Sequence, residues 1–307
     1  MDPIVAAAIF VFGLAFGSFL NVCVYRLPRD LSVVHPRSAC PNCNQWIAFH
    51  DNVPVLSWLL LRGRCRHCKA SISARYLVVE LLTGALFLAC YWHFGLTLAM
   101  LKYCVLGFLL LGLIFTDAET KLLPNKLTLT GLGLGLVFSL LVPVNDLASQ
   151  LLPGVVPLPM SSDVSWHLLS LLDALLGAAV GASFIYGAGA IYLRARGVQG
   201  MGFGDVKLMA MVGAFLGVKL TIFTLFTASI AGSVFGLSTI FVVWIKRTRR
   251  FMARQHATAG AARKRAWQSA RVVYRHYEMP FGVFLGSMAM VAFFFGNQFL
   301  HWYWGLM

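Results

Sequence analysis

Charged residues are scarce in this chain, and acidic residues are the scarcest of them. Only 12% of the 307 residues are charged, with 11 Asp and Glu against 25 Lys and Arg, while 59% are hydrophobic. A soluble domain typically carries about twice as much charge. The composition therefore excludes a soluble globular protein and predicts a membrane protein.

The first apolar run, at residues 4–24, lacks the features of a cleaved secretory signal. No basic region precedes it, and no small-residue cleavage site follows it. We therefore interpret it as a retained span. A hydrocarbon core of ~30 Å needs about 20 apolar residues per helix. The sequence predicts about eight such spans, or seven if the short run before Gly217 joins the next, at 4–24, 76–94, 98–116, 127–143, 168–193, 206–216, 220–245 and 281–300.

Basic residues are absent from the loop at 144–167 and are concentrated at 26–75 and 246–275. Cytoplasmic loops are enriched in Lys and Arg. The pattern therefore predicts an N-terminus outside the cytoplasm, both basic segments inside it, and an even number of spans. The second basic segment has few aromatic residues for base stacking and no recognisable binding module, so no nucleic-acid partner is expected. Anionic lipid headgroups are the expected partner.

Four of the seven cysteines form two CxxC pairs, which are Cys40 with Cys43 and Cys65 with Cys68. Two such turns can present four thiolates to one tetrahedral zinc ion. Thiols stay reduced in the cytoplasm, so disulfides and redox chemistry are the weaker alternatives. A four-sulfur site has no open position for a substrate, and the chain has no HExxH motif. The predicted zinc is therefore structural.

Acidic residues near the predicted spans are few, and ionisable groups at membrane depth often mark functional sites. The candidates are Glu80, Asp117, Asp173 and Asp205. The predicted topology places Asp173 near the outer end of its span, ~30 Å from the cytoplasmic end. The other three lie at cytoplasmic ends, so topology alone does not separate Glu80 from the two aspartates.

Asp205 follows the glycine-rich sequence Gly200-Met201-Gly202-Phe203-Gly204. Alternate glycines allow another chain to approach closely, which suits an extended peptide substrate. A phosphate-binding loop is the weaker interpretation, because no strand precedes the segment and no Walker lysine-serine pair follows it. Simple capping at helix ends is the structural alternative for both Asp117 and Asp205.

These segments resemble the bacterial type IV prepilin peptidases, which are membrane aspartyl proteases of the GxGD type. That family has one aspartate before a Leu-Pro-Asp/Asn stretch and another in GxGD followed by lysine. This chain matches with Asp117, Pro124, Gly202, Gly204, Asp205 and Lys207. Further matching segments are 17–21, 26–28, 74–76, 79–84 and 280–282. The chain departs from the family at Val283, where proline is usual, and in its longer loops at 144–167 and 246–275.

The resemblance implies an all-α polytopic protein of the bacterial inner membrane. It implies a first span at 1–24, a cytoplasmic zinc loop associated with methyl transfer at 25–75, and an aspartyl peptidase domain at 76–307 with a basic cytoplasmic loop at 246–279. Asp117 and Asp205 would cleave the basic leaders of type IV prepilins or type II secretion pseudopilins at the cytoplasmic face.

The same resemblance implies S-adenosylmethionine as the donor for N-methylation of the new N-terminus, with Gly63 linked to that activity. No Rossmann-type glycine turn predicts a site for this donor. Two other functions remain as alternatives. A transporter would favour acids at mid-membrane depth and an inverted repeat, whereas a membrane-anchored zinc-ribbon binding module would leave the Asp205 segment unexplained.

Overall fold

The computed structural model describes residues 2–144, 146, 162–197, 200–255, 260, 263–269 and 279–305. Helices dominate these residues, and two isolated bridges, Ala39 with Trp46 and Arg64 with Ser71, are the only β-type pairings among them. The predicted all-α class is therefore confirmed. The helices are α1 (Pro3–Arg26), η1 (Leu27–Arg29), η2 (Phe49–Asn52), α2 (Leu56–Leu60), α3 (Arg75–Phe94), α4 (Leu98–Thr120), α5 (Asn125–Leu141), α7 (Ser162–Arg196), α8 (Phe203–Gln255), α10 (Phe281–Val291), the π-helical turn η3 (Ala292–Gly296) and α11 (Asn297–Trp304).

Six helical segments of the described chain are long and apolar enough to cross a membrane. They correspond to α1, α3, α4, α7, α8 and the continuous segment formed by α10, η3 and α11. Helix α5 is apolar but shorter, with 17 residues. The structure thus confirms a polytopic helical protein but not the predicted count of eight spans.

Helix α8 is interrupted at Gly217, whose φ of 78° and ψ of −179° are not helical. A φ in this range is accessible to glycine at little cost. The position is also crowded, because a Cβ there would lie 2.5 Å from Asp146 Oδ2. Two of the predicted runs, 206–216 and 220–245, are therefore the two parts of α8 on either side of this break.

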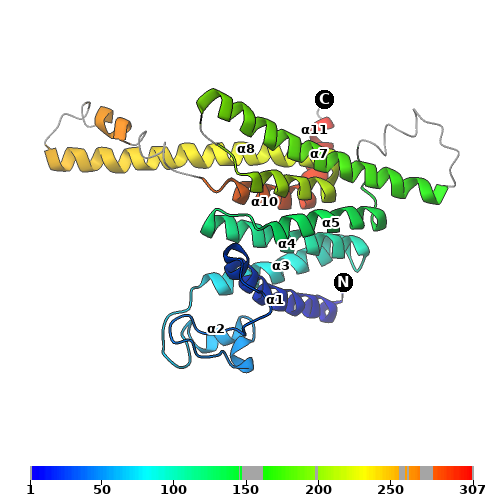
Figure 1. The fold of residues 1–307 in the computed structure, drawn as a ribbon, viewed down its shortest axis with the longest axis horizontal. Coiled ribbons are helices and arrows are strands. Elements are labelled where there is room, and N and C mark those ends of the chain that lie inside the picture. Colours follow the sequence, from blue (N-terminus) through cyan, green and yellow to red (C-terminus); the bar gives the residue numbers. More distant parts are fainter. Residues whose placement is uncertain are drawn as a thin grey trace.

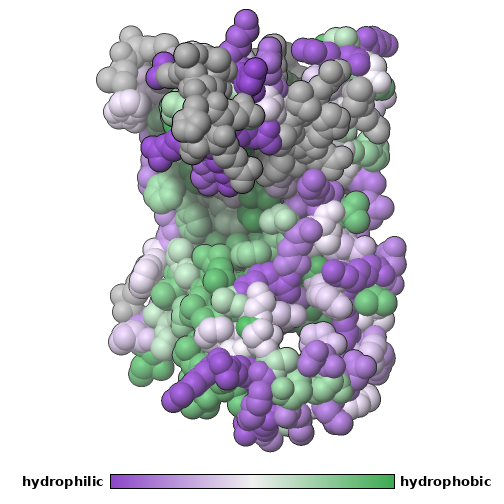
Figure 2. Space-filling model, turned by 90° about the vertical axis from the view of Figure 1, so that its left-hand side faces the viewer, coloured by the Kyte–Doolittle hydropathy of each residue, from purple (hydrophilic) through white to green (hydrophobic). Residues whose placement is uncertain are grey.

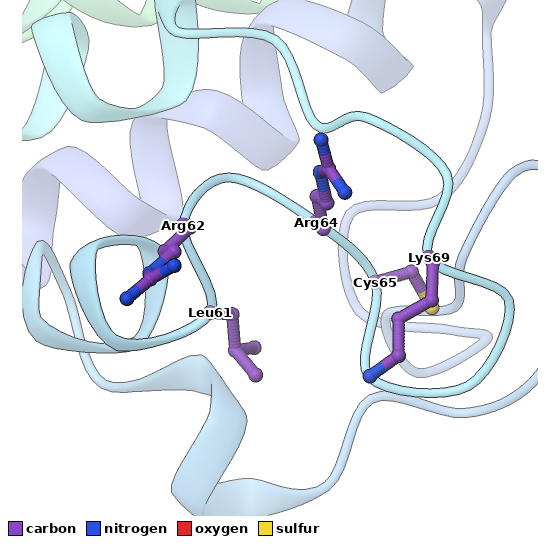
Figure 3. Close-up of a pocket in the computed structure, with 5 residues that line it drawn as sticks. All are labelled: Leu61, Arg62, Arg64, Cys65 and Lys69. Carbon is purple, nitrogen blue, oxygen red and sulfur yellow. The ribbon is translucent and has the colours of Figure 1, made fainter.

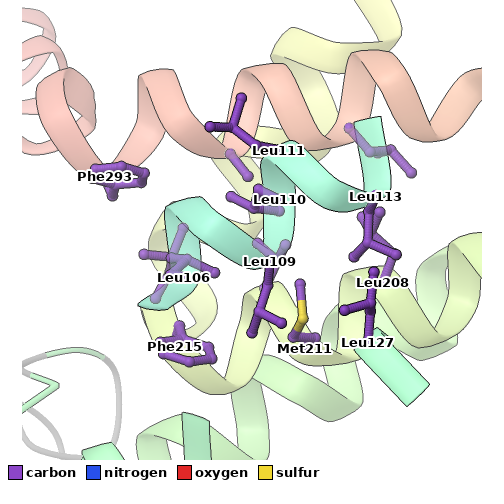
Figure 4. Close-up of a cluster of buried hydrophobic side chains, with 14 of the residues drawn as sticks. Leu106, Leu109, Leu110, Leu111, Leu113, Leu127, Leu208, Met211, Phe215 and Phe293 are labelled. Atoms are coloured by element: carbon purple, nitrogen blue, oxygen red, sulfur yellow. The ribbon is translucent and has the colours of Figure 1, made fainter. Parts of the chain in front are cut away.

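The core is built around α4, whose leucines are buried on several faces. Figure 4 shows them packed against side chains of α5, α8 and η3. Helix pairs approach closely where glycine removes the side chain. A Cβ on Gly13 would lie 2.8 Å from Gly84 Cα, which brings α1 onto α3. Small residues at such crossings are typical of membrane helices.

The four-cysteine loop lies beside the bundle, next to the end of α1 (Figure 1). Asn21 of α1 donates a 3.0 Å hydrogen bond to the Tyr76 carbonyl at the start of α3, which joins the two ends of the loop. Figure 2 views the molecule from this end and shows hydrophilic and apolar residues side by side over its lower part. Most of the predicted loops at 144–167 and 256–279 lie outside the described residues, whereas 246–255 continues α8.

Candidate active site and metal centre

Asp117 lies in the last turn of α4, and its side chain is buried. The helix ends at Lys121, which has a left-handed φ of 55° and donates its N–H to the Asp117 carbonyl at 2.9 Å. Pro124 then forms the N-cap of α5. A left-handed residue followed by proline ends a helix sharply, so the carboxyl group stays at the end of α4.

Asp205 lies in the first turn of α8 and is also buried. Its N–H donates to the Gly202 carbonyl at 3.1 Å. The free N–H groups of a helix N-terminus favour a carboxylate at this position. The glycines of the motif therefore begin the helix that carries Asp205.

Two contacts join the segment that follows Asp117 to the beginning of α8. A Cβ on Gly204 would lie 2.9 Å from Leu123 Cβ, so only glycine allows this approach. Lys207 Nζ donates a 2.7 Å hydrogen bond to Asn125 Oδ1 and lies 4.9 Å from the Phe203 ring centroid. The motif residues thus position the two segments that carry the aspartates.

Gly282, at the start of α10, lies next to the carboxyl groups of both aspartates. A Cβ there would be 2.9 Å from Asp117 Oδ2 and 3.3 Å from Asp205 Oδ1. The backbone N–H of Val283 donates a 3.0 Å hydrogen bond to Asp117 Oδ2. The structure therefore brings Asp117 and Asp205 together against the N-terminus of α10. The sequence motif at 280–282 includes Gly282 but does not reveal this role.

Glu80 has a different hydrogen-bond partner from the aspartate pair. Its Oε2 accepts a 2.7 Å hydrogen bond from the Val55 N–H, immediately before α2. Gly17 of α1 packs against the Glu80 backbone, where a Cβ would lie 2.6 Å from Glu80 Cα. Glu80 therefore joins the four-cysteine loop to α3, a role that its position in the sequence did not reveal.

An ion pair joins the start of α3 to the end of α4. The Arg75 guanidinium, at the start of α3, pairs with Glu119 of α4, two residues beyond Asp117. Asp173 lies in a different polar cluster, where its Oδ2 accepts a 3.1 Å hydrogen bond from the Asp146 N–H. The sequence-based separation of Asp173 from the other aspartates agrees with this placement.

The four cysteines of the two CxxC pairs form one cluster, with all four sulfur atoms within 4.8 Å of one another. In each pair the backbone carbonyl of the first cysteine accepts a hydrogen bond from the N–H four residues later. The distances are 2.9 Å for Asn44 to Cys40 and 3.1 Å for Lys69 to Cys65. Both of these residues have left-handed φ angles, 53° and 58°. The two pairs therefore form the same turn, related in conformation as well as in sequence.

This cluster fits a tetrahedral metal site. A zinc ion with Zn–S bonds of ~2.3 Å holds its sulfurs about 3.8 Å apart, and Cys40 Sγ lies 3.8 Å from Cys68 Sγ. Donors around Cys40 and Cys68 favour the thiolate form that a metal requires. Against the lowering effect of the Gln45 N–H, desolvation and the neighbouring cysteine side chains raise the pKa of Cys43 to about 11. The N–H of Ala70 and the Asn42 side-chain amide lower the pKa of Cys68 to about 6.

Gly63 lies in a tight turn with a φ of 63°, and a Cβ there would be 2.7 Å from Trp58 Cζ2. A cavity of about 280 Å³ adjoins this turn (Figure 3). It is lined by Leu61, Arg62, Arg64, Cys65 and Lys69, and Gly63 is not part of its lining. Gly63 therefore shapes the loop, and the cavity beside it has a cationic lining.

Comparison with known proteins relates most of the chain to one family. Residues 11–94 match the bacterial peptidase A24 N-terminal domain, and residues 104–237 match the type IV leader peptidase family. No solved structure matches the chain.

Three relatives named prepilin leader peptidase/N-methyltransferase are similar to this chain. The protein of Aeromonas salmonicida is 32% identical over 320 residues, covering 96% of this chain and 92% of that protein. That of Neisseria gonorrhoeae is 35% identical, covering 76% and 82%. That of Myxococcus xanthus is 40% identical over 239 residues, covering 76% of this chain and 63% of that protein. The chain belongs to the type IV leader peptidase family.

Proposed function

We propose that this chain is an inner-membrane prepilin leader peptidase that also N-methylates its product. The observation that carries the proposal is the close approach of both the Asp117 and the Asp205 carboxyl groups to Gly282. Its substrates would be type IV prepilins or type II secretion pseudopilins, and the word prepilin in the names of the relatives supports the first of these. The basic segments support an active site that faces the cytoplasm and an N-terminus outside it.

The chemistry follows from two carboxyl groups that share one site. They cannot both ionise easily, so they hold one proton between them. The ionised member takes a proton from a water molecule, whose oxygen adds to the substrate carbonyl, while the protonated member gives its proton to the carbonyl oxygen. Collapse of the tetrahedral intermediate breaks the C–N bond and transfers a proton to the leaving amine.

Three contacts hold the two aspartates in position for this chemistry. The Val283 N–H holds one oxygen of Asp117. The Gly204–Leu123 approach and the Lys207–Asn125 hydrogen bond keep Asp205 beside it. The four cysteines would hold a structural zinc ion that organises residues 25–75, while residues 76–307 form the peptidase domain.

S-adenosylmethionine is the methyl donor that we propose, and it would supply an electrophilic methyl group to the new N-terminal amine. The described residues around Gly63 do not form a fitting donor site. The neighbouring cavity is lined by three cations and no carboxylate, so nothing there balances a sulfonium charge or accepts from ribose hydroxyls. No step is therefore assigned to residues of this cavity.

The decisive experiment incubates the purified protein with a prepilin and measures the mass of the product. Loss of the leader and gain of one methyl group are expected. Asp117→Asn and Asp205→Asn should each abolish cleavage, while Asp30→Asn, an exposed aspartate with φ 55° that asparagine tolerates, should cleave normally. Substantial cleavage by both active-site variants would refute the aspartate assignment.

Methyl transfer is tested separately with Gly63→Lys. This change should abolish methylation while leader removal persists, because the turn packed on Trp58 lies in the loop and not at the aspartates. Zinc content, measured on the same sample, shows whether the loop still folds. Unchanged methylation would exclude a role for this turn.

A further inference from the structure

The short helix α2 has an inverted arrangement of polar and apolar residues. Leu56, Leu59 and Leu60 have exposed fractions of 58%, 54% and 82%, whereas Ser57 is buried and donates to the His50 carbonyl at 3.0 Å. Positions i, i+3 and i+4 share one face of a helix. The outward face of α2 is therefore entirely leucine, and Phe49 of the neighbouring η2 is 87% exposed.

Such a face is unfavourable in water, because clustered exposed leucines usually mark a surface that another partner covers. Three cationic residues lie shortly after α2 in the sequence. Arg62, Arg64 and Lys69 line the cavity shown in Figure 3. None of the carboxylates in the described part of the chain forms an ion pair with them. The surface therefore combines an apolar face with an unneutralised basic cavity.

Its position relative to the bundle indicates what covers it. Val55, the residue before α2, is hydrogen-bonded to Glu80, which lies in the second turn of the membrane-spanning helix α3. Figure 1 shows the loop beside the end of the bundle, next to α1. The residue before α2 therefore contacts the second turn of a helix that is long and apolar enough to span a membrane. Lipid headgroups would lie near that end of such a helix.

We propose that Leu56, Leu59 and Leu60, together with the cavity of Arg62, Arg64 and Lys69, form a docking surface for anionic phospholipids of the leaflet beside the loop. The leucines would enter the boundary between headgroups and acyl chains, and the cations would bind the headgroup phosphates. This arrangement of an apolar helix face next to basic residues is typical of interfacial anchors. The inference does not depend on the proposed enzymatic activity.

Hydrogen exchange of the full-length protein in nanodiscs tests this surface. Amides of residues 56–64 should exchange about five-fold more slowly in phosphatidylglycerol than in phosphatidylcholine discs, and added salt should reduce the difference. Equal exchange in both lipids would overturn the proposal. Protection that appears only when a pilin substrate is added would also overturn it, because the surface would then bind protein.

Two pairs of variants separate the apolar and the charged contributions. Leu60→Asp and Arg62→Gln should each abolish the lipid-dependent protection. Val34→Asp and Arg37→Gln, exposed positions of the same loop outside α2 and the cavity, should keep it. Zinc content checks that each variant folds. If Leu60→Asp loses zinc, Arg62→Gln and the salt dependence of the unmodified protein decide the outcome.

Discussion

The backbone N–H of Val55 donates a 2.7 Å hydrogen bond to Oε2 of Glu80, and this contact joins the four-cysteine loop to α3. Hydrogen bonds to charged groups contribute about 1.5–3 kcal/mol. Glu80→Ala should therefore speed hydrogen exchange at residues 53–57, while leader cleavage stays within a few-fold of the original rate. Glu80→Gln keeps an acceptor oxygen, so its exchange rate at residues 53–57 should lie between those of the unmodified protein and Glu80→Ala. Loss of cleavage in Glu80→Ala with normal loop protection would place Glu80 in the active site instead.

Val55 itself adopts a conformation that favours glycine. Its φ of 64° and ψ of −54°, with a 2.6 Å hydrogen bond from the Leu56 N–H to the Pro54 carbonyl, form a strained γ-turn. Val55→Gly should relieve about 1–3 kcal/mol of strain and raise the unfolding temperature of the loop. Val53→Gly is the matched control. Val53 is extended, with φ −72° and ψ 120°, so this change should lower that temperature.

Much of the fold was predictable because its signals are local. Apolar runs, basic loops and the paired CxxC spacing each depend on composition over a short stretch, and the structure confirms a polytopic helical protein with a clustered set of cysteines. The number of spans could not be predicted in the same way, because a single glycine at 217 decides whether α8 is one helix or two.

The roles of Glu80 and Val283 depend on contacts between distant segments, which sequence spacing does not encode. Glu80 has the same predicted depth as Asp117, but its carboxyl group accepts a 2.7 Å hydrogen bond from Val55, whereas that of Asp117 accepts one from Val283. Val283 appeared as a departure from the family pattern. In the structure it provides an N–H to Asp117 Oδ2, which a proline at this position lacks.

Gly282 provides a test of the aspartate pair that leaves both carboxyl groups in place. In Gly282→Ala the new Cβ would lie 2.9 Å from Asp117 Oδ2 and 3.3 Å from Asp205 Oδ1, so one carboxyl group must move. Displacement of a catalytic group by about 1 Å costs on the order of a hundred-fold in rate. We expect such a fall in kcat for leader cleavage. Gly133→Ala in α5, where no neighbouring atom lies within 4 Å, should cleave normally.

Val283→Pro removes one hydrogen-bond donor from Asp117 without adding a charge. Proline is tolerated in the first turn of a helix, so α10 should still form. Loss of a hydrogen bond to a charged group should lower kcat about ten-fold. Val283→Ala keeps the N–H and is the control. Equal rates for the two variants would show that this hydrogen bond does not contribute to cleavage.

Zinc retention should depend on pH, because protons compete with the metal for the thiolates. Neighbouring donors lower the pKa of Cys68 to about 6, so they help its thiolate compete with protons as the pH falls. Zinc release, followed with a chromogenic chelator, should therefore increase as the pH falls. Asn42 Nδ2 donates to Cys68 Sγ at 3.6 Å, so Asn42→Ala should move the release midpoint to higher pH. Asn52→Ala, at an exposed position in the same loop, should leave it unchanged, and an equal shift in both variants would show that the Asn42 contact is not the cause.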